Sequence, residues 1–131
     1  MKHELSNAID KIRSGAADGG SVVARFLYLL GVAYERDSNE FGKALLTSRK
    51  GGRVYFSERK GEIEQSGTGT NPRLIPGSSY WVLTKSSTEM KQALLKDVLR
   101  ALGYSEEAIR AAKELLGEAA SKVNKTQSGN V

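Results

Sequence analysis

Two blocks of helical periodicity enclose a polar, glycine-rich middle, and this order constrains the fold more than any other feature of the chain. Apolar residues recur every three to four positions over residues 22–34 and again over residues 88–116, as expected of amphipathic helices. Residues 57–79 between them are polar and hold four glycines and both prolines. The order predicts an α+β fold, a mostly helical domain with a small antiparallel β-sheet or hairpin in its middle.

The same patterns predict the individual elements. Helices are expected over residues 1–14, 22–34, around Phe41, over residues 88–102 and after Ser105. Strands are expected at residues 54–56 and 79–84, paired antiparallel, with residues 57–79 as one long polar loop between them. Ser21 and Ser105 fit as N-caps, and Ser86 with Glu89 fits a capping box.

The length of 131 residues is enough for one domain with one hydrophobic core. We expect three parts: an N-terminal helix and glycine-rich joint at residues 1–20, a domain at residues 21–118, and a polar tail at residues 119–131 that frays. The narrow apolar stripe of residues 1–14 fits packing on the domain, a mobile arm or a dimer contact. A homodimer formed through residues 1–20 is therefore one candidate assembly.

Catalysis has little support in this sequence. The chain has no cysteine, and its one histidine, His3, lies at the N-terminus, so neither a nucleophile–histidine arrangement nor a thiolate metal site can be argued. No spacing suggests metal ligands, and residues 67–70 lack the Gly-Lys-Ser/Thr end of a phosphate-binding loop. We expect a non-enzymatic protein with no catalytic residues, no metal and no cofactor.

Location follows from what the chain lacks. No apolar run approaches the roughly 18 residues that span a bilayer, and the N-terminus lacks the pattern of a signal peptide. The absence of cysteine fits a reducing compartment. We therefore expect a cytoplasmic protein with no membrane partner.

The chain is basic, with 20 Lys and Arg against 15 Asp and Glu, a net charge of +5 and a pI near 9.5. Many solvated proteins carry such a balance, and it also attracts polyanions. Its placement favours the second interpretation, because Arg49, Lys50 and Arg53 fall within five positions beside Gly51 and Gly52. Arginine binds phosphate bidentately and glycine lets the backbone approach it, although an ordinary surface turn would carry the same residues.

Two further polar segments complete a candidate face for DNA. Residues 66–73 offer hydroxyl and amide donors plus one arginine, or they form a plain connecting loop. Residues 84–88 lead into a helix N-terminus, which suits anions and can present side chains to a groove. The candidate DNA-binding residues are Arg49, Lys50, Arg53, Gly67, Thr68, Gly69, Thr70, Asn71, Arg73, Lys85, Ser86, Ser87, Thr88 and Lys91.

These motifs, in this order, resemble the C-terminal domain of the SeqA family. The resemblance is carried by Phe-Leu-Tyr at residues 26–28, Arg-Val-Tyr-Phe at 53–56 and Pro-Gly-x-x-Tyr-Trp-Val at 76–82, and it covers about residues 24–116. The family regulates bacterial replication initiation negatively and binds hemimethylated GATC sites. The resemblance implies a nucleoid-associated regulator of replication or transcription that approaches the major groove of double-stranded DNA with two loops.

The resemblance also implies roles for individual residues. Arg53 matches a basic residue beside the DNA backbone, residues 67–73 match a DNA-contacting loop, and residues 85–88 match the segment that reads the methylated base pair. The family pattern has asparagine where this chain has Lys85 and Ser87, and glycine at Glu89. Lysine favours phosphate or guanine contacts. The alternative hypothesis is a protein-interaction or assembly module that kept the fold and lost GATC readout.

Overall fold

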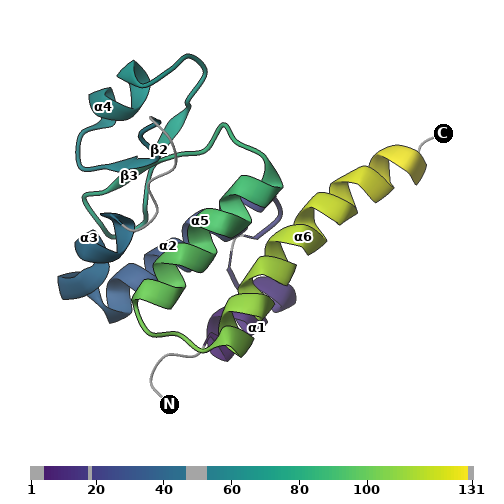
Figure 1. Cartoon of the computed structure of the whole chain (residues 1–131). Coiled ribbons are helices and arrows are strands. Elements are labelled where there is room, and N and C mark those ends of the chain that lie inside the picture. The colour runs from purple at the N-terminus through teal and green to yellow at the C-terminus, as the bar shows by residue number, and fades with distance from the viewer. Residues whose placement is uncertain (1–4, 18, 47–52, 130–131) are drawn as a thin grey trace.

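The computed structural model describes residues 5–17, 19–46 and 53–129, with side chains up to residue 121. Within these ranges it contains six helices and three strands (Figure 1). In chain order they are α1 (Ser6–Ser14), α2 (Val22–Arg36), α3 (Ser38–Leu46), β1 (Phe56–Ser57), α4 (Lys60–Gln65), β2 (Pro72–Leu74), β3 (Trp81–Leu83), α5 (Thr88–Ala101) and α6 (Glu106–Gly129).

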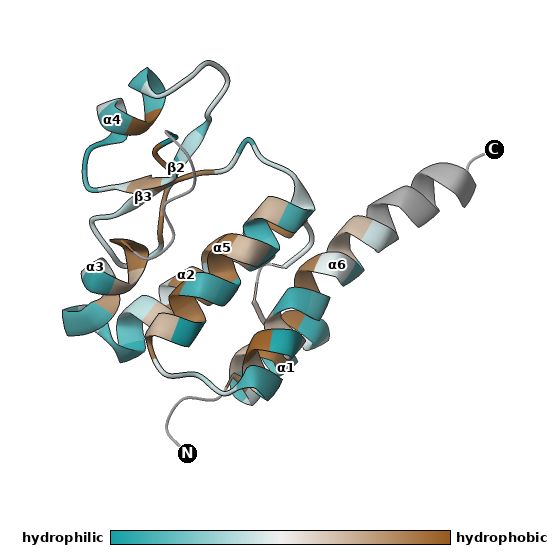
Figure 2. Cartoon of the chain, in the orientation of Figure 1, coloured by the Kyte–Doolittle hydropathy of each residue, from teal (hydrophilic) through white to brown (hydrophobic). Residues whose placement is uncertain are grey.

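Helices α2, α3, α5 and α6 surround one hydrophobic core. Helix α6 packs along α5 and also touches α1 and α2, while α3 packs against α2 and α5. Fully buried side chains from these helices, such as Phe26, Leu30, Leu95 and Leu115, fill the centre. Figure 2 shows hydrophobic and hydrophilic residues on each of these helices, as expected of amphipathic elements around a core. The predicted α+β fold, mostly helical with a small antiparallel sheet, is confirmed.

Helix α1 packs on the rest of the molecule. Its apolar residues Ala8, Ile9 and Ile12, and Leu5 just before it, are buried in the main core, and the helix contacts α2 and α6. Of the three roles left open by the pattern of residues 1–14, the structure therefore shows packing on the domain. In Figure 1 the helix lies beside the first turns of α6.

A buried arginine holds the glycine-rich joint that follows α1. Arg25 on α2 is only 6% exposed. Its Nε donates a 2.7 Å hydrogen bond to the carbonyl oxygen of Gly19, and its Nη1 donates one of 2.7 Å to the carbonyl oxygen of Leu115 on α6. Hydrogen bonds from a charged group are among the stronger ones in proteins. Arg25 thus ties the joint, α2 and α6 together.

The sheet has three antiparallel strands in the order β1-β3-β2. The expected pairing of the two hydrophobic strands is confirmed, with Phe56 opposite Val82. The expected long loop at residues 57–79 is wrong, because this segment contains α4 and the edge strand β2. Helix α4 buries a single apolar side chain, Ile63, which is too little to create a helical pattern. Pro72 begins β2, a position at a sheet edge where the missing N–H of proline is tolerated.

The sheet has apolar side chains on both of its faces. Adjacent strand residues point to opposite faces, and Val82 belongs to the main core. Its neighbour Leu83 and Ile63 of α4 are also fully buried but lie outside that cluster. Since α4 contacts all three strands, it covers one face of the sheet and the helical body covers the other.

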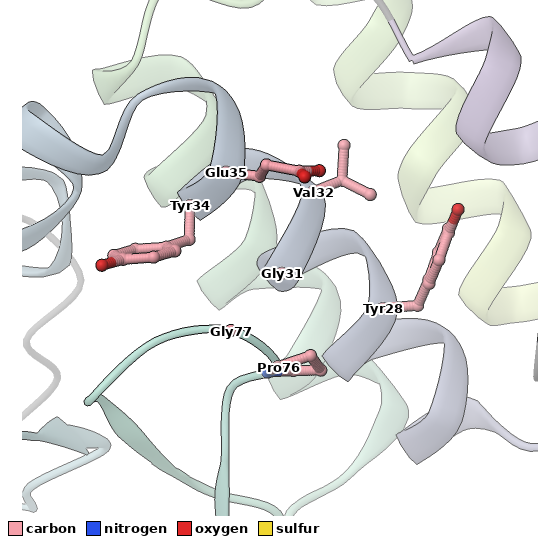
Figure 3. A pocket seen from close by; sticks show the side chains of 7 residues that line it. All are labelled: Tyr28, Gly31, Val32, Tyr34, Glu35, Pro76 and Gly77. Atoms are coloured by element: carbon pink, nitrogen blue, oxygen red, sulfur yellow. The ribbon is translucent and has the colours of Figure 1, made fainter.

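The turn before β3 attaches the sheet to α2 at a close backbone approach. A Cβ added at Gly31 of α2 would lie 3.2 Å from both the Cβ and the carbonyl oxygen of Pro76, so a side chain there would push the turn away. Figure 3 shows Pro76 and Gly77 lying against this part of α2, with Tyr28 and Tyr34 on either side. Tyr80 adds a second attachment, because its ring meets those of Tyr34 and Phe41 edge to face.

The helix ends agree only partly with the sequence. Ser21 and Ser105 accept hydrogen bonds from the N–H groups of Ala24 and Ala108, so both predicted N-caps are confirmed. The capping box predicted at Ser86 is wrong, because the cap of α5 is Ser87. Helix α6 runs to Gly129, past residue 118, where the sequence pattern places the end of the domain. None of the described helices has the length and apolar character needed to cross a bilayer.

Candidate nucleic-acid interface

Two polar segments that are far apart in sequence are joined directly at one end of the sheet. The N–H groups of Thr84 and Lys85 donate to the carbonyl oxygen of Thr70, at 3.2 and 3.1 Å, and the Thr84 hydroxyl donates to the carbonyl oxygen of Asn71 at 2.6 Å. Thr70 and Thr84 are each only 4% exposed. The loop of residues 67–73 and the segment of residues 84–88 therefore form one surface.

Arg53 joins the same surface from the strand side. The space next to Gly67 is occupied by its guanidinium, and a Cβ added at Gly67 would lie 3.3 Å from Nη2 and 3.5 Å from Nε of Arg53. The side chain is half-buried. Its Nε is a buried donor with no hydrogen-bond acceptor among the described residues. The structure thus brings together the predicted residues Arg53, Gly67, Thr70 and Lys85.

The exposed part of this surface is polar and glycine-rich. Thr68, Gly69, Asn71, Arg73 and Lys85 are exposed. Residues 67–72 line an open hollow of about 530 Å³ together with Lys60 and Glu64 of α4. The sequence did not point to these two α4 residues, because nothing in a short helix with one apolar position indicates what it packs beside.

A second groove continues the surface past β2. It has a volume of about 730 Å³, and among its lining residues are Asn71 and Arg73 from the candidate surface and Lys11 from α1. Among the described residues, its lining holds two cations and no carboxylate. Leu74 also lines it and is one of the two exposed large hydrophobic residues among those described.

The start of α5 is organised around two serines. Ser87 is exposed and its hydroxyl oxygen accepts a 3.0 Å hydrogen bond from the N–H of Met90, which makes it the N-cap. Ser86 is half-buried and accepts hydrogen bonds from Nζ of Lys91, at its carbonyl oxygen (2.7 Å) and at its hydroxyl (3.2 Å). Thr88 follows as the first residue of α5 and is half-buried.

Lys91 lies in a different position from the other predicted site residues. It is only 3% exposed, and burial lowers the pKa of its ammonium group. The side chain therefore lies beneath the segment of residues 84–88 and not on its outer surface. Arg49 and Lys50 lie outside the described residues, as does His3.

Another hollow lies between α2 and the turn before β3. It has a volume of about 390 Å³, and the described residues that line it are Tyr28, Gly31, Val32, Tyr34, Glu35, Pro76 and Gly77, with Glu35 the single carboxylate among them (Figure 3). Among the described residues, no three His, Asp or Glu side chains gather closely enough to hold a metal ion.

Comparison with known proteins identifies the family of this chain. The family model of the SeqA protein C-terminal domain matches residues 12–115. This chain belongs to that family. The SeqA match begins inside α1, which agrees with the packing of that helix on the domain.

Three relatives show how far the likeness to SeqA extends. Proteins named "Negative modulator of initiation of replication" are 43% identical over 84 residues in Idiomarina loihiensis, 38% over 95 residues in Pseudoalteromonas translucida and 32% over 100 residues in Hamiltonella defensa. These alignments cover 64%, 72% and 76% of this chain and 52%, 48% and 57% of the relatives. The chain thus spans about half the length of the curated relatives it matches.

A solved structure supports the SeqA fold. The crystal structure of V. cholerae SeqA is 24% identical and superposes with a TM-score of 0.66, covering 84% of this chain and 98% of that one. The three-stranded sheet and the helical body therefore form an arrangement already known from that structure.

Proposed function

We propose that this chain binds double-stranded DNA as a SeqA-type regulator of replication initiation. The proposal rests on one observation. Residues 67–73 are hydrogen-bonded to residues 84–88 through Thr70, Asn71 and Thr84. Arg53 beside this junction and the exposed Arg73 and Lys85 add cations that suit phosphate. Relatives that carry the name of replication modulator support the regulatory role. We expect association with the nucleoid and no enzymatic activity.

In this proposal, the exposed residues of the segment at residues 84–88 contact the bases. Lys85 and Ser87 are exposed, and lysine can donate to guanine or to phosphate, whereas serine discriminates weakly between bases. We propose that the sequence or methylation preference depends mainly on Lys85 and differs from that of family members with asparagine there.

The alternative of an assembly module is less well supported by the structure. Its motivations were the replacement of asparagine by Lys85 and Ser87, the carboxylate of Glu89, and a spare helix at the N-terminus. The third no longer supports it, because the apolar residues of α1 are buried within the chain. Among the described residues of this segment, the polar face of α1 remains exposed and would be open to a homodimer contact.

Fluorescence anisotropy with labelled duplexes tests the proposal. The duplexes carry one GATC site that is unmethylated, hemimethylated or fully methylated, and a fourth has a scrambled site. We expect binding that weakens steeply as salt rises, because phosphate contacts release counterions. Absence of binding to all four duplexes at low salt would refute DNA binding. Equal affinity for all four duplexes would show non-specific DNA binding and would refute the proposed sequence or methylation preference.

A further inference from the structure

Residues 84–88 alternate between the inside and the outside of the molecule. Thr84 is buried, with its hydroxyl bonded to Asn71. Lys85 is exposed, Ser86 is half-buried and bonded to Lys91, and Ser87 is exposed again. This alternation decides which side chains of the segment can touch a ligand.

Lys91 is the group that turns Ser86 inward. A buried ammonium requires hydrogen-bond acceptors, because leaving it unpaired is costly. Among the described residues, both acceptors within reach of its Nζ belong to Ser86, the carbonyl oxygen at 2.7 Å and the hydroxyl oxygen at 3.2 Å. One turn of α5 is thereby bonded to the loop that precedes it.

The neighbouring backbone is restrained at the same place. The N–H of Ser86 donates to the carbonyl oxygen of Thr84 at 2.9 Å, and the N–H of Lys85 donates to Thr70 at 3.1 Å. Lys91 therefore completes a set of contacts that fixes the segment from below, while the Thr70 contact fixes it from the side. A binding loop held in one shape loses less conformational entropy when it binds.

We infer that Lys91 is a positioning residue, which holds Ser86 inward so that Lys85 and Ser87 face the DNA, and which does not itself contact DNA. The inference rests on the proposed function, since it concerns how that surface is built. The sequence suggests a different role for Lys91, a contact with phosphate, because the residue follows closely after residues 84–88. The burial of Lys91 argues against that role.

The test compares the same substitution at two lysines. Lys91→Met removes the buried ammonium and keeps a flexible side chain of similar length, and Lys85→Met does the same at the exposed neighbour. Affinity for the preferred duplex is measured by anisotropy at several salt concentrations. We expect Lys91→Met to weaken binding about tenfold with an unchanged slope of log affinity against log salt. Lys85→Met should lower that slope by about 0.9 for a lost phosphate contact or shift the base preference.

A second readout needs no DNA. Amide hydrogen exchange followed by NMR in the free protein should show faster exchange at Lys85 and Ser86 in Lys91→Met than in wild type or Lys85→Met. If Lys91→Met does not fold, Ser86→Ala removes one of the two acceptors, leaves the Lys91 ammonium bonded to the carbonyl oxygen of residue 86, and should loosen the same amides.

The possible results distinguish a failure of the positioning role of Lys91 from a failure of DNA binding. If the salt slope of Lys91→Met falls by about as much as for a lost phosphate contact, Lys91 touches DNA and the inference is wrong. Unchanged exchange at Lys85 and Ser86 in the folded variants would also overturn it. If the wild type binds no duplex, DNA binding fails, while the exchange data still decide whether Lys91 positions the segment.

Discussion

The hydroxyl of Thr84 donates a 2.6 Å hydrogen bond to the backbone carbonyl oxygen of Asn71, 13 residues earlier in the chain. Asn71 holds a left-handed conformation with φ of 46°, which asparagine adopts more readily than most other non-glycine residues. Thr84 is buried at the end of β3, so the bond links the loop after α4 to the framework of the sheet. The candidate surface therefore depends on a residue that a bound duplex would not need to touch.

Replacing Thr84 with valine should destabilise the protein by about 1–2 kcal/mol, because the isosteric side chain leaves the Asn71 carbonyl with one hydrogen bond fewer. Thermal unfolding measures the change, and DNA affinity should fall with it as the contact between the two segments weakens. Thr68→Val alters an exposed hydroxyl of the same loop and should stay within about 0.5 kcal/mol of wild type. Equal losses of thermal stability in the two variants would contradict this account of the Thr84 hydrogen bond.

Replacing Arg53 with alanine should weaken binding to every duplex and lower the salt slope by about 0.9, as expected when one phosphate contact is lost. Anisotropy titrations on specific and scrambled duplexes provide the measurement. Arg110→Ala is the control for charge, since Arg110 is exposed on α6, which has no contact with the sheet among the main packing pairs. A loss confined to a single sequence would instead mean that Arg53 reads bases.

Replacing Arg25 with methionine should destabilise the fold by roughly 2–4 kcal/mol, because two carbonyl oxygens lose a charged donor that is buried. The exposed pair of Arg13 and Glu118, whose side chains are 50% and 47% exposed, provides the contrast. Arg13→Ala should cost at most about 1 kcal/mol despite a separation of 2.6 Å. Denaturant unfolding of both variants tests this order, and the reverse order would refute it.

Replacing Ile12 with alanine should destabilise the protein by about 2–5 kcal/mol, since its side chain is 4% exposed in the main core. Light scattering should show the same molar mass as wild type if α1 serves only the core of its own chain. Asn7→Ala changes the exposed face of α1 and should leave stability nearly unchanged. A dimer that Asn7→Ala dissociates would support self-association through residues 1–20.

Acid should weaken the junction between α5 and α6. The Arg100 guanidinium donates hydrogen bonds of 2.9 and 2.5 Å to Glu106 and lowers the pKa of that carboxyl below its usual 4.5. A carboxyl whose pKa is lower in the folded than in the unfolded protein stabilises the fold when the pH is above its unfolded pKa. This stabilisation is lost as the pH falls through its folded pKa. Glu106→Gln should therefore flatten the fall of the melting temperature as pH drops below about 5. Glu107→Gln changes the next exposed carboxylate of the same helix turn. This variant should keep more of the acid-induced fall in melting temperature than Glu106→Gln does.

Much of the helical framework could be predicted from the chain alone. The apolar residues buried in α1, α2 and α5 are those of the apolar stripes, whereas the buried Arg25 and Lys91 lie outside that pattern. Ser21 and Ser105 cap as expected. Prediction failed where one buried residue supports an element, as Ile63 does in α4, because a single apolar position has no period. It also failed by one residue at the cap of α5, since Ser86 and Ser87 offer the same hydroxyl.

The sequence by itself determined the fold class, the helical faces and the segments that could meet DNA, because these depend on local periodicity and on residue type. Only the tertiary structure decided how those segments meet. It placed Thr84 against Asn71, the guanidinium of Arg53 against Gly67 and the ammonium of Lys91 beneath Ser86. The first two of these contacts join residues that are 13 and 14 positions apart, so they leave no pattern along the chain. The third joins Lys91 to a residue five positions away, and the chain alone does not show whether that lysine turns inward or toward the solvent.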